Sequence, residues 1–169
     1  MTTAHSVCST FNSLPTEKFE WLSYTDVLTE RLRKQSAQVE MTVLSHEWVP
    51  SNWWERSVLH LNTDLIRRDI LMQAEGKPRW FARTIIPKIT YALDPAFFDR
   101  LYNEPLGKLI FNESRVVRHM IHSYGIDNRH LEFYWLNRDW FKNSDGIWMR
   151  LSFLEFMQAA PFYLAEIFI

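Results

Sequence analysis

Hydrophobic residues recur with two different periods along the chain, and the change of period divides the sequence into helices and strands. The first part has helical spacing and predicts two short helices divided at Thr25, the first with Phe19 and Leu22 and the second with Val27, Leu28 and Leu32. Alternation then predicts strands at 39–49, 64–87 (as a hairpin), 114–124, 130–141, 148–157 and 162–169. Because helices come early and do not alternate with strands, we predict an α+β fold, an antiparallel sheet with helices clustered on one side.

Glycine, proline and small polar residues mark the boundaries between these elements. Residues 74–78 form the predicted turn of the hairpin, and further turns are predicted at 125–128, 143–146 and 159–161. Asp94 followed by Pro95 predicts a helix start, because aspartate caps a helix and proline fits its first position. The segment 50–63 has no clear period, and we assign it no element.

Two predicted helix starts offer backbone N–H groups to an anion. With Thr25 as N-cap, Leu28 takes the third helical position, where its N–H lacks an intrahelical partner. Pro105 at the first position of a later helical turn leaves Leu106 and Gly107 in the same state. Such groups bind anions, although a capped helix with a solvated end is the simpler interpretation of both segments.

The predicted hairpin places an arginine in an otherwise apolar row. Alternation puts Ile66, Arg68, Ile70 and Met72 on one face of the sheet, and Leu65, Arg67, Asp69 and Leu71 on the other. A buried guanidinium without a partner is strongly unfavourable. We therefore expect Arg68 to contact an anion, either a protein carboxylate or a bound ligand.

The last predicted strand carries a single charge, Glu166, with Leu164 and Phe168 on its own face. We expect this residue to be buried, and burial raises the pKa of a carboxyl group. Two interpretations remain open. Arg68 and Glu166 form one buried ion pair or bond to backbone groups, or they lie at opposite ends of a closed cavity and bind a small anionic ligand. Arg83 either extends that anion site or is structural.

Composition favours one well-packed domain. A chain of 169 residues, 47% of them hydrophobic, buries a large core, so we predict one domain over 15–169 after a loosely ordered tail over 1–14. The formal net charge of -1 argues against a nucleic-acid partner. Cys8, the only cysteine, excludes an internal disulfide and fits an inert thiol. Neither a membrane-length apolar run nor a leader is recognisable, so we expect a cytoplasmic monomer.

The sequence lacks the common motifs of metal and nucleotide chemistry. The six histidines form no HExxH or HxxEH array, and His119 and His122 fall on opposite faces of their predicted strand. No GxGxxG, GxxxxGK[ST] or GxSxG stretch occurs. We therefore expect no metal and no cofactor.

Several stretches of the chain resemble one known family, chorismate lyase. They are Arg68–Leu71, the turn Glu75–Pro78, the run Ala82–Pro87, and Pro105–Gly107 with Phe111 after it. The resemblance extends from about residue 19 to residue 169. It departs from the family at 159–161, where relatives have a glycine, and around 128–143, which is longer here. The resemblance implies a ligand site buried between the sheet and helical flaps.

The resemblance also implies a role for each candidate residue. In the family the hairpin arginine binds a ring carboxylate, and this role falls on Arg68. Backbone N–H groups that complete the carboxylate site fall on Leu106, beside Gly107, and on Leu28. The family's glutamate in the last strand falls on Glu166, beside the ring hydroxyl, where it either transfers a proton or only binds the hydroxyl.

The implied reaction is elimination of pyruvate from chorismate to give 4-hydroxybenzoate, the first committed step of ubiquinone biosynthesis. It needs no cofactor, because formation of the aromatic ring drives it, and a pocket that fits the product should release it slowly. A rival is the effector-binding domain of the same fold in transcription regulators, but residues 1–15 leave no room for a helix-turn-helix domain. A third possibility is a protein-interaction domain in which the charged residues are only structural.

Overall fold

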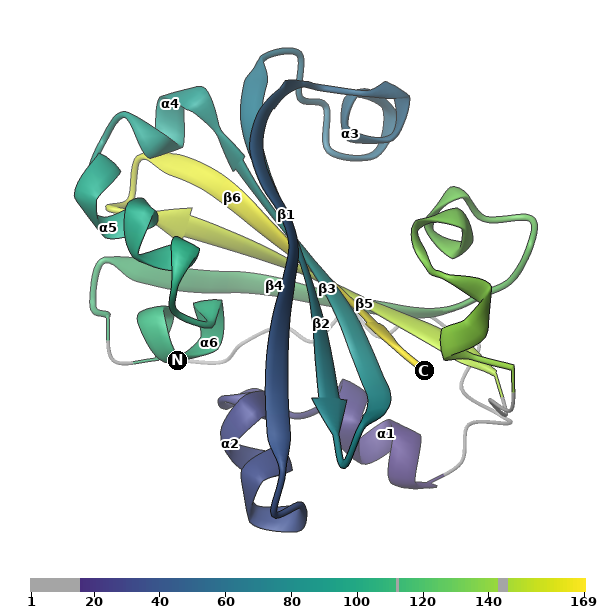
Figure 1. Ribbon diagram of the computed structural model, residues 1–169. Coiled ribbons are helices and arrows are strands. Elements are labelled where there is room, and N and C mark those ends of the chain that lie inside the picture. Colours follow the sequence, from purple (N-terminus) through teal and green to yellow (C-terminus); the bar gives the residue numbers. More distant parts are fainter. Residues whose placement is uncertain (1–15, 112, 143–145) are drawn as a thin grey trace.

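The chain folds around one antiparallel sheet of six strands in the order β1-β2-β3-β6-β5-β4 (Figure 1). The structure is a computed structural model and describes residues 16–111, 113–142 and 146–169. Its strands are β1 (Val39–Pro50), β2 (Asp64–Ala74), β3 (Lys77–Pro87), β4 (Val116–Ile126), β5 (Ile147–Phe156) and β6 (Ala160–Phe168). The antiparallel sheet and the α+β class are confirmed. The predicted tail over 1–14, Cys8 and the turn residues 143–145 lie outside the described residues.

The predicted hairpin is confirmed as β2 and β3. Glu75 and Gly76 form its turn with left-handed φ angles of 54° and 72°, and glycine suits this conformation because it has no Cβ. β3 also pairs with β6, so that Ala82 lies opposite Glu166. The hairpin is therefore flanked by strands on both sides, and β3 is buried along most of its length.

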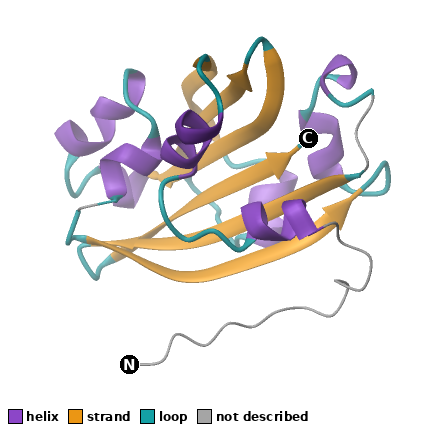
Figure 2. Ribbon diagram, turned by 90° about the horizontal axis from the view of Figure 1, so that it is seen from below, coloured by secondary structure: helices purple, strands orange, loops and turns teal. Residues whose placement is uncertain are grey.

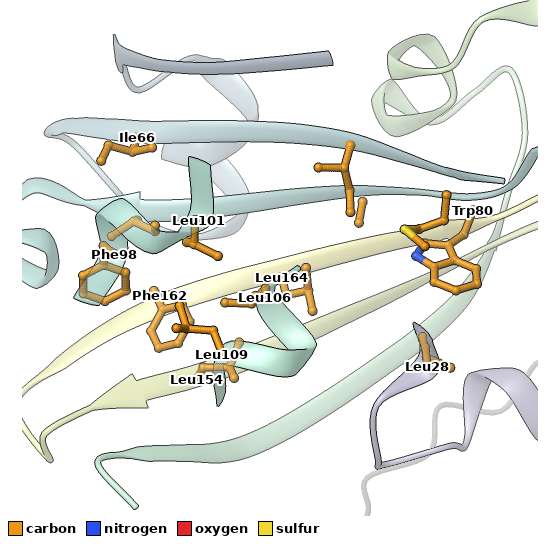
Figure 3. Close-up of a cluster of buried hydrophobic side chains, with 14 of the residues drawn as sticks. Leu28, Ile66, Trp80, Phe98, Leu101, Leu106, Leu109, Leu154, Phe162 and Leu164 are labelled. Carbon is orange, nitrogen blue, oxygen red and sulfur yellow. The ribbon is translucent and has the colours of Figure 1, made fainter. Parts of the chain in front are cut away.

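Helices cover both faces of the twisted sheet, and the predicted cluster is one of the two groups (Figure 2). The helical segments are α1 (Thr16–Leu22), α2 (Leu28–Gln35), α3 (Trp53–Val58), α4 (Lys88–Tyr91), α5 (Pro95–Asp99), η2 (Arg100–Tyr102), α6 (Leu106–Ile110), η3 (Leu131–Trp135) and η4 (Arg138–Trp140). α1, α2, α5 and α6 pack on one face around an apolar cluster that includes Trp80 and Leu164 (Figure 3). α3 and the segment of η3 and η4 pack on the other face around Phe81 and Met149.

The strand predicted at 130–141 is wrong, because this segment forms η3 and η4. Its aromatic residues occur at consecutive positions, so they do not alternate between two faces as a strand requires. They pack on the second face of the sheet: Phe133, Trp135, Trp140 and Phe141. The turn predicted at 125–128 also begins later, since Gly125 and Ile126 still pair with β5.

Local capping explains two of the short helices. Asp94 caps α5 as predicted, since its side chain accepts the N–H of Phe97 at 3.0 Å. In the segment left unassigned, Asn52 and Glu55 form a capping box that begins α3. Glu55 is fully buried and also pairs with Arg67 at 2.7 Å. None of the helices in the described part of the chain is long and apolar enough to cross a membrane.

Candidate functional site

A small cavity lies between the sheet and the starts of α2 and α6, which Figure 3 shows on the same side of the sheet. The residues predicted for a ligand site all line it: Arg68, Glu166, Leu28, Leu106 and Gly107. Its volume of ≈ 40 Å³ is room for about three water molecules. A ligand with an aromatic ring therefore enters only when the two helix starts move apart.

Arg68 is a buried charge in the cavity with no carboxylate partner among the described residues. It is 1% exposed. Its Nη2 donates to the backbone carbonyl of Glu104 at 3.1 Å and lies 3.7 Å from Sδ of Met41, while Nε is buried without a hydrogen-bond partner. Burial lowers the pKa of Arg68 to about 10. The guanidinium thus stays protonated at neutral pH and keeps an N–H donor for an anion.

Glu166 pairs with Arg150, so the ion pair considered between Arg68 and Glu166 is wrong. Nε and Nη2 of Arg150 lie 2.7 Å and 2.6 Å from Oε2 of Glu166, because β5 and β6 hold the two residues in direct register. Nη1 of Arg150 donates to the backbone carbonyls of Trp21 and Tyr24. The bonds described for the carboxylate all use Oε2, which leaves Oε1 to accept from a ligand.

Arg150 was not among the predicted site residues, although its strand carries the same signal as that of Arg68. Alternate residues of β5 share one face of the sheet: Trp148, Arg150, Ser152, Leu154 and Phe156. Arg150 therefore stands in a mostly apolar row, as Arg68 does in β2, and it too is 1% exposed. The test of alternation that identified Arg68 identifies Arg150 as well.

α2 begins at Leu28 with Val27 as its N-cap, and the predicted capping by Thr25 is wrong. Thr25 instead offers its backbone carbonyl to Nη1 of Arg118 at 3.1 Å. Leu28 is the first helical residue rather than the third, but an N–H of the first turn still has no intrahelical acceptor. Because Leu28 lines the cavity, its N–H stays a candidate donor to a ligand.

α6 begins at Leu106, one residue later than predicted, with Pro105 in the N-cap position. The N–H groups of Leu106 and Gly107 precede the first intrahelical bond, which the N–H of Leu109 donates to the carbonyl of Pro105. A Cβ on Gly107 would lie 3.2 Å from Cγ1 of Val27. The starts of α2 and α6 therefore lie close together at the cavity, with no room for a larger residue at 107 unless Val27 shifts.

Arg83 lies on the opposite face of the sheet and does not extend the anion site. Its Nε and Nη2 donate to the carboxylate of Asp69 at 2.8 Å and 2.7 Å. The guanidinium also lies 4.1 Å from the ring centroid of Trp135, close enough for a cation–π interaction. These contacts satisfy its charge and support the structural interpretation.

Arg118, which sequence analysis did not single out, reaches the cavity from β4. Its Nε is buried and has no hydrogen-bond partner among the described residues. Burial lowers the pKa of Arg118; the charge of Glu166 opposes this, the charge of Arg150 adds to it, and the charge of Asp26 opposes it. Arg118 is thus a second guanidinium at the cavity with a donor to spare.

His46, also missed, approaches Arg68 from β1. A bulge between Val43 and Ser45 shifts the register of β1, so that His46 lies directly opposite Arg68 and on the same face of the sheet. Its ring stacks on Tyr102 with centroids 3.8 Å apart, and its Nδ1 is buried without a partner among the described residues. Burial, followed by the charge of Arg68, lowers the pKa of His46 below 6.5.

The histidines do not gather into a metal site in the described ranges. His119 pairs with Glu155 at 2.8 Å, and His130 lies 3.0 Å from Asp127. No group of three or more His, Cys, Asp or Glu side chains suited to hold a metal ion is found among the residues that the structure describes.

Comparison with known sequences relates the chain to one family. The family model for chorismate lyase matches residues 6–169. The chorismate pyruvate-lyase of Pectobacterium atrosepticum is 26% identical over 158 residues, which is 92% of this chain and 78% of that protein. The chorismate pyruvate-lyase of Escherichia coli strain K12 is 26% identical over 164 residues, which is 96% of this chain and 88% of that protein.

Solved structures with a similar fold are transcription regulators. PhnF from Mycobacterium smegmatis superposes with a TM-score of 0.54 at 12% identity, covering 86% of this chain and 64% of PhnF. A GntR-family regulator from Bacillus cereus gives 0.51 at 14% identity, covering 77% of this chain and 90% of the regulator. At such low identity the likeness shows the fold alone.

Proposed function

The chain belongs to the chorismate lyase family, and on that basis we propose that it eliminates pyruvate from chorismate to leave 4-hydroxybenzoate. One observation of the structure supports this most directly. Arg68 is a buried cation with an unpartnered Nε at a small cavity that Glu166 also lines. That arrangement suits a small molecule with a carboxylate at one end and a hydroxyl at the other. On this proposal the product is the aromatic precursor of ubiquinone.

The ring carboxylate binds to Arg68 in this proposal. Nε of Arg68 and the N–H groups of Leu28 and Leu106 are the donors that this proposal assigns to the ring carboxylate. Hydrogen bonds between a guanidinium and a carboxylate are charge-assisted and directional. They fix the orientation of the ring, which lowers the entropic barrier to reaction.

Glu166 acts at the other end of the ring. Its Oε2 is held by Arg150, which fixes the carboxylate and leaves Oε1 to accept from the ring hydroxyl. Two roles fit this position: transfer of a proton during the elimination, or recognition of the hydroxyl alone. The kinetics of Glu166→Gln distinguish the two roles.

The elimination balances without a redox partner. The ring carbon that carries the hydroxyl loses a proton, the bond between the ring and the ether oxygen breaks, and the departing enolpyruvate takes up a proton to become pyruvate. Aromatisation supplies the driving force, so no cofactor takes part. All of the groups used come from one chain, and a monomer suffices.

Closure of the cavity affects release as well as chemistry. The close approach of Gly107 and Val27 narrows the cavity, and on this proposal closure around the substrate excludes water and strengthens the charged hydrogen bonds inside. The aromatic product keeps the carboxylate and the hydroxyl that the cavity recognises. We therefore expect product release to be slow relative to chemistry.

An effector-binding domain is the competing function, since the regulators above share the fold. A sensor binds its ligand unchanged, whereas a lyase converts it. The purified protein is incubated with chorismate, 4-hydroxybenzoate is measured by chromatography, and pyruvate is measured with lactate dehydrogenase. Equimolar products formed over many turnovers support the lyase; binding of chorismate without either product contradicts it.

A further inference from the structure

An open groove of ≈ 520 Å³ adjoins the small cavity. Asp26, Val27, Gly107 and Arg118 line both spaces and form the boundary between them. Arg118 is the cation of this boundary. Because the ring carboxylate is assigned to Arg68, the anion that Arg118 binds must be a different one.

Arg118 resembles Arg68 in its hydrogen bonding. Each donates to one backbone carbonyl, that of Thr25 or of Glu104, and each keeps a buried Nε without a partner among the described residues. Other arginines of the sheet are paired with carboxylates: Arg67 with Glu55, Arg83 with Asp69 and Arg150 with Glu166. Among the described residues, Arg68 and Arg118 have no such pair and both line the cavity, whereas Arg79 of β3 has none either but is exposed and lies away from it.

Chorismate carries two carboxylates, one on the ring and one on the enolpyruvyl side chain. Each of them loses hydration when the substrate is enclosed, and a desolvated charge needs a partner. We propose that Arg118 binds the enolpyruvyl carboxylate, so that the side chain to be eliminated lies at the boundary with the open groove. This inference rests on the proposed function and adds the residue that recognises the leaving group.

The sheet places the two arginines on opposite sides of Glu166. Arg68 is on β2 and Arg118 is on β4, and the intervening strands are β3, β6 and β5. Glu166, on β6, therefore lies between two cationic positions and is itself neutralised by Arg150. A dianion with a hydroxyl near its middle matches this order of charges.

The two arginines then have different tasks. The product 4-hydroxybenzoate keeps the ring carboxylate but has lost the second one with pyruvate. Arg68 therefore binds both the substrate and the product, whereas Arg118 binds only the substrate. The released pyruvate carboxylate is already at the open groove, which gives it a way out while the ring is still enclosed.

The test compares substrate and product in Arg118→Gln and Arg118→Lys. Loss of one charge-assisted hydrogen bond lowers binding of its ligand by roughly 10- to 100-fold, so kcat/KM for chorismate should fall by about that factor in Arg118→Gln. Arg118→Lys should recover part of the loss. The Kd of 4-hydroxybenzoate, followed by tryptophan fluorescence, should change less than about twofold, since this ligand lacks the second carboxylate.

Arg129→Gln is the matched control, because Arg129 is an exposed arginine paired with Asp127 away from the cavity. It removes the same charge and should leave both constants unchanged. If Arg118→Gln weakens chorismate and 4-hydroxybenzoate equally, Arg118 only tethers the carbonyl of Thr25 and the inference is wrong. It is equally wrong if kcat/KM for chorismate is unchanged.

A binding experiment on the wild-type protein is independent of folding in the variants and of turnover. 3-(Carboxymethoxy)benzoate carries a second carboxylate on an ether arm, and 3-methoxybenzoate lacks it. The dicarboxylate should bind at least about tenfold more tightly, and Arg118→Gln should abolish the difference. Equal affinity in the wild type overturns the inference. A wild-type protein that prefers the dicarboxylate but forms no 4-hydroxybenzoate contradicts the proposed function instead.

Discussion

Arg68 and Arg150 are equally buried and line the same cavity, yet their surroundings differ. Arg150 has a carboxylate on the neighbouring strand and two backbone carbonyls from the segment before α2. Arg68 has one backbone carbonyl, a thioether contact and an unpartnered Nε. Burial of a charge alone therefore does not identify a binding site. An unused buried donor is the more informative sign, because it is left for a ligand or a water molecule to satisfy.

Strand register accounts for the difference. Arg150 lies directly opposite Glu166 in the β5–β6 ladder. Arg68 lies opposite Thr84 on one side and His46 on the other, and neither residue supplies an anion. We expect substitutions at the two arginines to separate stability from ligand binding.

The largest effect is expected at Arg150. Arg150→Met leaves Glu166 buried without its partner, which costs about 3 to 5 kcal/mol of unfolding free energy. Urea denaturation followed by tryptophan fluorescence measures the loss. The double variant Arg150→Met with Glu166→Leu should recover part of it, because the uncompensated charge is gone. A single variant as stable as the wild type would contradict the structural role of the pair.

Arg68→Met should have the opposite profile. Removal of a desolvated, unpaired cation keeps or raises stability, while kcat/KM and the affinity for 4-hydroxybenzoate fall together by about 100-fold, since both ligands use this contact. Arg68→Lys should recover part of the affinity. The folded-state pKa of Arg68, about 10, lies far above neutral, so the stability change should not vary between pH 6 and pH 8. If Arg68→Met lost as much unfolding free energy as Arg150→Met, the proposed difference between the two arginines would be wrong.

Glu166→Gln tests the residue that pairs with Arg150 and that, in the proposal, also acts on the ring hydroxyl. The amide oxygen still accepts from Arg150 but proton transfer is lost, so an acid/base role predicts a fall in kcat of about 100-fold with product affinity kept. Recognition of the hydroxyl alone predicts a smaller loss that appears in KM. Glu55→Gln, in the buried pair with Arg67 on the other face, is the matched control and should leave kcat unchanged.

The smallest expected effect concerns His46 on β1. Its ring stacks on Tyr102, and the charges of Arg68 on β2 and of Asp99 on α5 act on it. Its pKa in the folded state is below 6.5, so the unfolded chain binds the proton more readily. Stability is then fully present above pH 6.5 and is lost as the pH falls through the folded-state pKa. Urea midpoints between pH 8 and pH 5 should fall more steeply for the wild type than for His46→Gln. Parallel curves would show that His46 does not contribute.

Local signals in the sequence were enough for part of the fold and of the candidate site. The turn at Gly76 and the cap at Asp94 follow from short stretches of chain, and both are observed. Arg68 and Glu166 each stand out in an apolar strand, and both line the cavity. Their mutual ion pair, one of the interpretations left open, is not found, because which strands are neighbours is a non-local property that alternation does not encode.

Two of the residues that were not predicted, His46 and Arg118, lie beside irregularities in their strands, whereas alternation alone marks Arg150. Strict alternation from residue 39 places His46 on the face opposite Met41, and only the bulge after Val43 turns it towards Arg68. Arg118 also adjoins a bulge, between Arg118 and Met120 in β4. Bulges insert a residue without a reliable sequence mark, so the side chains that they redirect are found only in the folded sheet.

The contact between Gly107 and Val27 makes two positions far apart in the sequence behave as a coupled pair. A Cβ added at residue 107 would lie 3.2 Å from Cγ1 of Val27, so a side chain at 107 would have to share the space between the two helix starts with the side chain at 27. Sequence drift at one position is therefore constrained by the other. A change towards bulk at 107 is compatible with a tightly shut lid only in company with a smaller residue at 27, so the two sites are expected to vary together or not at all.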